Sequence, residues 1–303
     1  MSPGLEWRSE LARAFPEAKF DEPLSLHTTF RIGGPADCYA EPRDAEELLR
    51  LLRLARENAL PVLFVGWGSN LLVRDGGVRG VVARLRGEFE AVEFPGGCRV
   101  RAGAGVRLPR LVALCAERGL GGCEFLAGVP GSVGGALVMN AGTREGDIGS
   151  LVQEVEALDF ETLKIARLPA AQLHFRYRGS DLEGRVVLAC LLELKPGGKG
   201  DIMMRVQRHQ KNRLQTQPIH TYNVGSTFKN PPGRFAAKLI EDAGLKGTRC
   251  GGARVSELHA NFIENFAHAK AEDVLELVRR VREKVKSVCG VELELEMKVV
   301  GES

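Results

Sequence analysis

The chain has 303 residues, of which 44% are hydrophobic and 27% charged, so a globular protein of two or three domains is expected and disorder is excluded. The formal net charge of +3 at pH 7 does not indicate a nucleic-acid-binding protein. No apolar run approaches the ~18 residues that span a membrane, and the first residues lack the continuous apolar stretch of a signal peptide, so no membrane partner is expected.

The front of the chain is expected to alternate strands and helices. Residues 24–40 predict two strands joined by a turn at 33–35, and residues 44–58 predict a helix whose N-cap is Asp44. Residues 62–65 predict a buried strand that leads into a glycine loop. The elements expected next are short strands over 80–106, a helix over 108–119 and strands over 151–194.

The segment 195–201 combines Pro, Gly and charge and is the best candidate for a linker. Helices are expected over 201–214, 236–245 and 271–289, followed by an alternating strand over 291–300. We therefore expect an α+β fold with two functional domains. The first is 1–196, itself of two lobes (about 1–80 and 81–196), and the second is 197–303.

The seven cysteines are scattered and form no C-x-x-C pair, so neither a disulfide framework nor a metal site is expected. Reduced thiols favour a cytoplasmic protein. Two glycine loops stand out, GWGSN (66–70) and PGSVGGALVMNAG (130–142). Glycines let backbone N–H groups converge on an anion, so together the loops indicate one extended cofactor, although such turns also occur for purely structural reasons.

Several long motifs then follow one another in a specific order: HTTFRIGGPAD, GWGSNLLV, FLAGVPGSVGGALVMNAG, FRYRGS, NVGSTFKNP, AAKLIEDAGLKG, GGARVSELHANFIEN and LELEM. This set resembles the UDP-N-acetylenolpyruvoylglucosamine reductase family over about residues 24–300. The resemblance implies a two-lobed FAD-binding domain of the vanillyl-alcohol-oxidase/PCMH type, followed by a smaller α+β domain that binds a UDP-sugar.

The implied reaction is the NADPH-dependent reduction of UDP-N-acetylglucosamine enolpyruvate to UDP-N-acetylmuramate, in peptidoglycan precursor synthesis. In this family FAD is bound, NADPH is the co-substrate and hydride passes through the flavin N5. The resemblance implies that the following residues contact FAD: Thr29, Arg31, Ile32, Gly66, Trp67, Gly68, Ser69, Asn70, Leu71, Gly131, Ser132, Gly134, Gly135, Asn140, Ala141 and Gly142.

Three residues match the catalytic positions of the family. Ser226 matches the proton donor, although a serine in a glycine turn is usually a backbone cap. Glu296 matches the catalytic acid; periodicity alone would make it one of a solvated row, and Glu294 competes if the register slips. Arg178 matches the arginine that stabilises the enolate, a task that suits a planar, permanently charged fork.

Substrate contacts are implied for a further set of residues: Arg213, Gln217, Lys229, Asn230 and His259. The chain lacks room after FRYRGS for the tyrosine-bearing loop that closes the site in some family members, so it resembles the shorter subtype. Arginines and lysines within 197–230 are our expectation for the group that closes the site instead. A monomer or weak oligomer is expected.

Two alternatives remain open. One is a flavin-dependent oxidase of the same fold acting on a small alcohol. The other is a non-catalytic nucleotide-binding or RNA-binding protein that uses the basic helix expected over 201–214.

Overall fold

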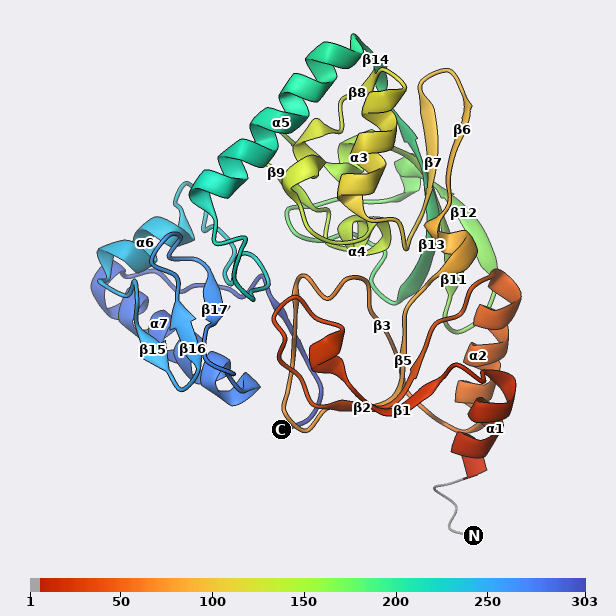
Figure 1. The fold of residues 1–303 in the computed structure, drawn as a ribbon, viewed down its shortest axis with the longest axis horizontal. Coiled ribbons are helices and arrows are strands. Elements are labelled where there is room, and N and C mark those ends of the chain that lie inside the picture. Colours follow the sequence, from red (N-terminus) through yellow and green to blue (C-terminus); the bar gives the residue numbers. More distant parts are fainter. Residues whose placement is uncertain (1–5) are drawn as a thin grey trace. The chain divides into compact units, whose positions relative to one another are not determined.

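The computed structural model describes residues 6–303, and the chain folds into two compact units (Figure 1). Unit 1 consists of the described residues up to Ala18 together with Tyr39–Gly66 and Val82–Asn212. Unit 2 consists of Lys19–Cys38, Trp67–Val81 and Arg213–Ser303. Two early segments therefore pack with the C-terminal part of the chain. The expected division into an FAD-binding part (1–196) and a substrate-binding part (197–303) is a division by ligand, and it stays a prediction.

Unit 1 is built on a five-stranded antiparallel sheet, with helices on one face. Its strands lie in the order β12 (Ile165–Pro169), β11 (Val152–Asp159), β13 (Arg185–Glu193), β7 (Arg99–Gly103) and β6 (Val92–Gly96). The short helix α4 (Val133–Val138) packs on β13 and β7, and α3 (Leu108–Glu117) lies on the same side (Figure 1). Their apolar side chains join those of the sheet in one buried core.

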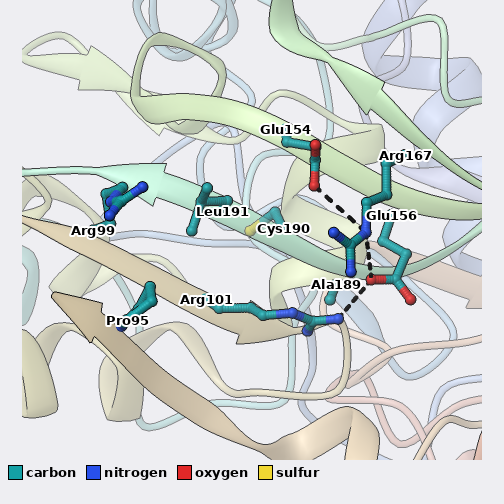
Figure 2. Close-up of a pocket in the computed structure, with 9 residues that line it drawn as sticks. All are labelled: Pro95, Arg99, Arg101, Glu154, Glu156, Arg167, Ala189, Cys190 and Leu191. Carbon is teal, nitrogen blue, oxygen red and sulfur yellow. Dashed lines mark hydrogen bonds and ion pairs between the residues drawn. The ribbon is translucent and has the colours of Figure 1, made fainter.

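Another face of this sheet carries a groove of ≈ 190 Å³, shown in Figure 2. Arg101 Nη2 donates to Glu156 Oε2 at 2.5 Å, and Arg167 Nε lies 3.8 Å from Glu154. Burial raises the pKa of the Cys190 thiol to about 12, so this thiol stays protonated at neutral pH. The charged groups of the groove thus largely neutralise one another, and none of the predicted site residues lines it.

The remaining strands of the front half form a four-stranded sheet in the order β1 (Lys19–Pro23), β2 (Pro35–Ala40), β5 (Val78–Ala83) and β3 (Val62–Phe64). A strand is present at 62–64 as expected, but its residues are half-buried and not fully buried. Helix α1 (Glu6–Ala14) comes before this sheet in the chain. Two-stranded ladders join β8 (Leu120–Gly121) to β14 (Lys195–Pro196), and β9 (Gly142–Thr143) to β10 (Gly146–Asp147).

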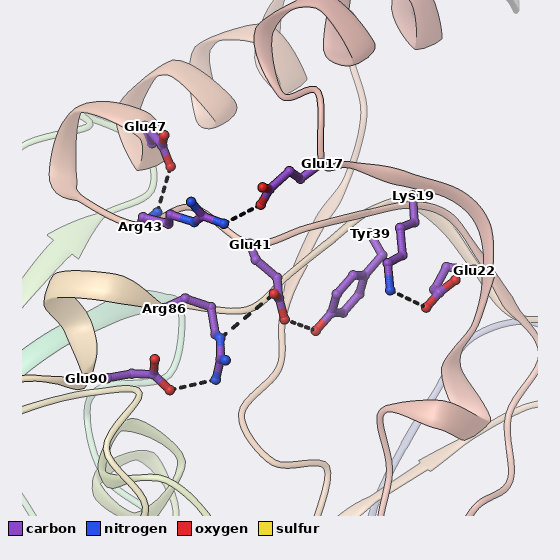
Figure 3. Close-up of polar contacts among 9 residues, drawn as sticks. All are labelled: Glu17, Lys19, Glu22, Tyr39, Glu41, Arg43, Glu47, Arg86 and Glu90. Atoms are coloured by element: carbon purple, nitrogen blue, oxygen red, sulfur yellow. Dashed lines mark hydrogen bonds and ion pairs between the residues drawn. The ribbon is translucent and has the colours of Figure 1, made fainter.

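Charged side chains fix the start of helix α2 (Ala45–Glu57) in unit 1 (Figure 3). Asp44 caps it by accepting the Glu47 N–H at 2.8 Å, as predicted. Nearby, the Tyr39 hydroxyl donates to Glu41 Oε1 at 2.9 Å, and burial raises the Tyr39 pKa. The phenol therefore stays protonated and acts as a structural hydrogen-bond donor.

The other predicted helices are present: α5 (Lys199–Thr216), α6 (Ala236–Asp242) and α7 (Ala271–Cys289). Gly290 ends α7 with φ +68°, a left-handed conformation that favours glycine. The apolar residues Val274, Leu277, Val278, Val281 and Val285 of α7 are buried, whereas Val288, in the last turn, is exposed.

Unit 2 is a small α+β layer. The antiparallel strands β15 (Arg249–Cys250), β16 (Ala253–Val255) and β17 (Ile263–Asn265) form a three-stranded sheet. Strands β15 and β16 pack against α7, and α6 packs against α7 as well. Asp75, from the front of the chain, accepts the N–H groups of Ala271 at 2.9 Å and Glu272 at 3.1 Å. This carboxylate satisfies two free donors at the start of α7 and ties an early segment to the last helix.

Two strand predictions are wrong in extent. The first concerns residues 24–40, where two strands joined by a turn were expected. The first of these strands lies at 19–23 instead. Residues 24–34 form a 3-10 turn (Leu24–Leu26) and a folded loop, in which Thr28 Oγ1 donates to Ile32 O at 3.1 Å. In the second, only β18 (Lys298–Val300) joins a ladder, parallel to β4 (Leu71–Val73). Burial alternates as predicted over 291–294, but Leu295 and Glu296 are both half-buried, and the segment has no continuous neighbouring strand there.

Among residues 6–303, no helix is both long enough and apolar enough to cross a bilayer. The same part of the chain contains no group of three His, Cys, Asp or Glu side chains placed to hold a metal ion. All seven cysteines are free thiols.

Candidate active site

The segments that carry Ser226 and Glu296 are hydrogen-bonded neighbours in unit 2. The Glu296 N–H donates to Thr227 O at 2.9 Å, and the Lys229 N–H donates to Glu294 O at 2.8 Å. Ser226 and Glu296 are both half-buried. Two residues separated by 70 positions in the sequence thus lie on adjoining backbone segments.

The competing acid, Glu294, has a different environment. Its carboxylate is 76% exposed and lies 3.4 Å from Lys229 Nζ. Glu296 is less exposed, and its carbonyl accepts the side-chain N–H of Asn70 at 3.0 Å. The structure therefore connects Glu296, rather than Glu294, to the glycine loop.

A buried asparagine holds the backbone segment that follows Ser226. Asn261 Oδ1 accepts the Phe228 N–H at 2.9 Å, and Asn261 Nδ2 donates to Phe228 O at 2.8 Å. The Thr227 N–H also donates to Asn261 O, at 2.8 Å. Asn261 is 3% exposed, so its amide is used inside the protein and is not available to a ligand.

The part of the glycine loop that belongs to unit 2 is tied to the Ser226 loop as well. Thr29 Oγ1 donates to Asn223 O at 2.7 Å, and the Thr29 N–H donates to Gly68 O at 3.2 Å. At Gly68, φ is +60° and a Cβ would lie 2.4 Å from His27 O, so only glycine fits. These contacts place the residues of 67–70 beside both candidate catalytic segments of unit 2.

The residues around Arg31, which are predicted to contact the cofactor, form a strained turn. Arg31 has φ +56°, and Asn265 Nδ2 donates to Phe30 O at 3.0 Å beside it. The Arg31 guanidinium lies 5.8 Å from the centre of the Tyr222 ring. Ile32 is 2% exposed, so its side chain belongs to the core and only its backbone could reach a cofactor.

In unit 1 the two predicted glycine loops meet. A Cβ on Gly66 would lie 2.4 Å from Ser132 Oγ, and a Cβ on Gly134 would lie 2.9 Å from Ala104 Cβ. The nearest atom to a Cβ on Gly135 would be Ser132 Oγ at 3.7 Å, and Gly135 is exposed. Glycine at 66 and 134 allows the close approach, and Gly135 leaves open space at its surface.

These loops fit an anionic cofactor. Within residues 6–303, the backbone N–H groups of Gly66 and Gly68 make no hydrogen bond to the protein. Free N–H groups on glycines suit the diphosphate of a dinucleotide. Other residues predicted to contact the cofactor occupy the same loops or their ends: Trp67, Ser69 and Leu71, and Gly131, Ala141 and Gly142.

Arg178 occupies the tip of a tight turn in unit 1. The N–H groups of Arg176 and Gly179 donate to one another's carbonyls at 2.9 and 3.2 Å. Arg178 has φ +58°, a conformation that favours glycine at this position of a turn. Its guanidinium lies 5.0 Å from the Tyr177 ring centre. An arginine at a position that favours glycine is kept there at a conformational cost, which is typical of functional sites.

The predicted substrate residues all lie in unit 2, in varied surroundings. Arg213 Nε donates to Gln217 Oε1 at 3.0 Å, and burial lowers the Arg213 pKa, although an arginine stays charged. Asn230 Oδ1 accepts the Ala236 N–H at 3.0 Å and so caps α6. Lys229 is half-buried beside Glu294, as described above.

His259 is half-buried, and its ring packs edge-on against Phe262 at 4.7 Å between centres. Burial lowers the pKa of His259, so the neutral imidazole is favoured near neutral pH. Its Nδ1 atom is buried and has no hydrogen-bond partner within residues 6–303. A polar ligand group could therefore satisfy this atom.

Asn265 and Asp75 were not singled out from the sequence, and the roles of Asn140 and Asn261 inside the protein were missed. A signal for the two asparagines of 261–265 exists in SELHANFIEN, because asparagines within an apolar run must be hydrogen-bonded when they are buried. Which backbone groups they bind could not be predicted, since the partners lie far away in the sequence.

Comparisons with known proteins give one consistent result. The model of an FAD binding domain matches residues 36–167, and the model described as UDP-N-acetylenolpyruvoylglucosamine reductase, C-terminal domain, matches residues 217–300. UDP-N-acetylenolpyruvoylglucosamine reductase 2 of Symbiobacterium thermophilum is 46% identical over 303 residues, covering 99% of this chain and 98% of the relative. The corresponding reductase of Moorella thermoacetica is 49% identical, with 93% of each chain covered.

Among solved structures, the UDP-N-acetylenolpyruvylglucosamine reductase of Thermus caldophilus superposes with a TM-score of 0.81. It is 40% identical to this chain, and the match covers 93% of this chain and 98% of that one.

Proposed function

The chain belongs to the UDP-N-acetylenolpyruvoylglucosamine reductase family, and from this premise we propose that it reduces UDP-N-acetylglucosamine enolpyruvate to UDP-N-acetylmuramate at the expense of NADPH. The α+β fold and the family expected from the motifs are confirmed. The reaction makes a precursor of peptidoglycan. Two observations support the proposal together. The chain is similar to the reductases over nearly its full length, and hydrogen bonds connect the segments of Ser226, Glu296 and the glycine loop.

FAD is the cofactor of this oxidoreductase. We propose that the free N–H groups of Gly66 and Gly68, with the loop 131–135, bind its diphosphate, and that 29–32, 69–71 and 140–142 contact the rest of the molecule. When bound, FAD supplies the two-electron chemistry that transfers hydride from NADPH to the enolpyruvyl double bond.

Ser226 is proposed to donate the proton that completes the reduction. A serine hydroxyl is a weak acid, so it needs a neighbouring group that stabilises the oxygen when the proton leaves. Lys229 and Asn230 follow in the same loop and are the candidates for that support. The hydrogen bonds from Asn261 to the adjoining backbone support this role, because they restrict where the hydroxyl can lie.

Glu296 is proposed to act with Ser226 on the same intermediate, by polarising it or by supporting the proton transfer. Its partial burial and its backbone link to Asn70 favour it over the exposed Glu294.

Arg178 is proposed to stabilise the enolate that forms at the substrate carboxylate. A planar guanidinium can hold both oxygens of such a group, and its charge does not depend on pH. The left-handed conformation of Arg178 supports this role, because glycine would serve a purely structural turn better.

The sugar nucleotide is proposed to bind residues of 197–303, chiefly Arg213, Gln217, Lys229, Asn230 and His259. The half-buried Arg213 supplies positive charge for the diphosphate, and His259 Nδ1 is an unsatisfied polar atom. In this proposal 1–196 acts as the FAD domain, in two lobes, and 197–303 as the substrate domain. The cytoplasmic location, a part in cell shape and division, and a monomeric or weakly oligomeric state stay predictions.

The experiment that tests the proposal uses the purified full chain. We expect a yellow protein with flavin absorbance, and NADPH oxidation that requires UDP-N-acetylglucosamine enolpyruvate. A flavoprotein that ignores the sugar and oxidises a small alcohol with oxygen would instead establish the oxidase alternative. A colourless protein that binds RNA with a steep salt dependence would contradict both.

A further inference from the structure

We propose that Asn140 is a positioning residue that holds the Arg178 turn through its side-chain amide. The inference rests on the proposed role of Arg178 in the reaction. According to this proposal, the Asn140 side chain is hydrogen-bonded within the protein. Only the backbone of 140–142 is then available to contact a cofactor.

The Arg178 turn needs external support. Arg178 has φ +58°, which costs a residue other than glycine about 1 kcal/mol relative to the right-handed region. The two hydrogen bonds between Arg176 and Gly179 close the turn but do not attach it to the rest of unit 1. A turn in such a conformation keeps one position only when the surrounding structure restrains it.

Asn140 provides the restraint at the start of the turn. Its Nδ2 donates to Arg176 O at 3.2 Å, and its Oδ1 accepts the Gly149 N–H at 3.0 Å. Asn140 is 4% exposed, and its two hydrogen bonds are partly buried. One amide thus joins the Arg178 turn to the segment after β10, and both of its ends are used.

Asparagine suits this position for two reasons. Asn140 itself has φ +42°, and asparagine tolerates the left-handed region better than most residues. Its side chain also offers a donor and an acceptor at once, which aspartate and leucine do not. Aspartate would keep the acceptor for Gly149 but would place a carboxylate oxygen against Arg176 O, because it lacks the Nδ2 donor.

Two further contacts hold the end of the same segment. Ser180 Oγ donates to Val138 O at 3.0 Å, and Ser180 is fully buried. A Cβ on Gly149 would lie 2.5 Å from Phe175 Cγ, so the ring before the turn packs directly on this glycine. Exposed polar contacts also exist, since Arg176 Nη1 donates to Asp181 Oδ1 at 3.0 Å. This contact offers a matched control, because it holds the same turn but is exposed to solvent.

The test compares four FAD-loaded proteins with the wild type: Asn140→Asp, Arg178→Ala, the double variant, and Asp181→Asn as the control. Stopped-flow absorbance measures flavin reduction by NADPH and, separately, reoxidation by UDP-N-acetylglucosamine enolpyruvate. We expect Asn140→Asp to slow reoxidation by ~10–100-fold, since a catalytic group displaced by about 1 Å costs about that much. Reoxidation by the sugar should slow by at least ~10-fold more than flavin reduction by NADPH, as expected when the loss lies mainly in one step.

The double variant decides whether Asn140 acts through Arg178. If it does, Asn140→Asp costs nothing further once Arg178 is alanine, because the two changes remove one shared function. Additive losses, or an equal slowing of both half-reactions, would overturn the proposal.

A second measurement does not depend on activity. Limited trypsin digestion reports the opening of the turn, since trypsin cuts after Arg176 and Arg178. We expect cutting at these bonds to rise at least ~10-fold in Asn140→Asp and about twofold or less in Asp181→Asn, because Asn140 is a buried side chain whereas the contact between Arg176 and Asp181 is exposed. Unchanged cutting in Asn140→Asp would overturn the proposal. If the wild type fails to reduce the enolpyruvyl sugar, the proposed function fails, whereas this digestion still tests the restraint.

Discussion

In unit 2, Ser226 and Glu296 lie on segments joined through backbone hydrogen bonds, whereas in unit 1 Arg178 lies in a turn that side chains hold in place. The backbone bond from Glu296 N–H to Thr227 O would survive the replacement of either side chain. The Arg178 turn has a left-handed residue at its tip and depends on Asn140 and Ser180.

Because of this difference, the candidate residues of the two units are sensitive to different substitutions. A residue held by backbone bonds can be changed to test its chemistry alone, because its neighbours stay in place. A residue held by side chains can lose its position without being changed itself.

The largest effect is expected for Ser226→Ala. Turnover of the enolpyruvyl sugar should fall by ~10²–10⁴, which is the usual contribution of a positioned acid. Flavin reduction by NADPH and the melting temperature should stay close to those of the wild type, because the backbone bonds remain. Stopped-flow half-reactions and calorimetry measure both. A parallel fall in flavin reduction would remove the proton-donor role.

Arg178→Lys should lower turnover by about 10²–10³, since a point charge does not reproduce a planar fork at the developing enolate. The loss should appear in reoxidation by the sugar and not in reduction by NADPH. Steady-state kinetics with the purified variant check this result. Near-normal turnover would exclude Arg178 from the mechanism.

Asn261→Ala tests how the backbone segment that follows Ser226 is held. It leaves the Phe228 N–H and C=O buried without partners, so unfolding should become easier by about 2–3 kcal/mol. Urea denaturation measures the change. Asn230→Ala is the matched control, because Asn230 is exposed and its side chain accepts the first N–H of α6, and it should cost about 1 kcal/mol or less. Similar losses in both variants would contradict the restraint assigned to Asn261.

Unit 1 contains a pH-sensitive side-chain contact that can be measured directly. Glu124 accepts the Gly122 N–H at 2.6 Å and the Arg205 Nε at 2.9 Å. Burial acts to raise the pKa of Glu124, but these hydrogen bonds and the Arg205 charge together hold it below the ordinary value of 4.5. The folded state thus binds this proton less tightly than the unfolded state does.

The stabilisation from Glu124 should be complete above about pH 4.5 and should be lost as the pH falls through the lowered value. At pH 7, Glu124→Gln should cost about 1 kcal/mol, a small figure because Arg205 is 44% exposed and water can replace part of the pairing. The variant and the wild type should converge once the pH lies below the lowered pKa of Glu124. Urea denaturation at pH 3 to 7 provides the comparison, and a pH-independent difference would contradict the argument.

The smallest effect has the opposite sign. Arg178→Gly should stabilise the fold by about 0.5–1 kcal/mol, because glycine adopts φ +58° without the penalty of a Cβ. The same variant should have little activity. Calorimetry and kinetics on one sample test both statements, and a loss of stability would show that the arginine side chain supports the turn.

Much of the molecule could be predicted from patterns close together in the sequence. The helix at 45–57 and its Asp44 cap follow from local signals, and so does the end of α7 at Gly290. The family could be recognised from the order of long motifs, and the comparisons confirm it. Local signals were sufficient here because capping, helical periodicity and left-handed glycine act over only a few residues.

Strand extents could not be predicted in the same way. The segment 291–300 alternates apolar and charged residues, yet only 298–300 forms a ladder, because β4 runs beside that part alone. Alternation reports which side of a segment is buried. It does not report whether a neighbouring strand is present.

The residue types of the site and their motifs are readable in the linear chain, since chemistry requires particular side chains at particular spacings. The pairing of Asn140 with Arg176, of Asn261 with Phe228 and of Asn70 with Glu296 exists only once the chain is folded. These amide contacts join positions 33 to 226 residues apart and carry no local pattern. An asparagine can bind any backbone group it reaches, so only the packed tertiary structure decides which one it restrains.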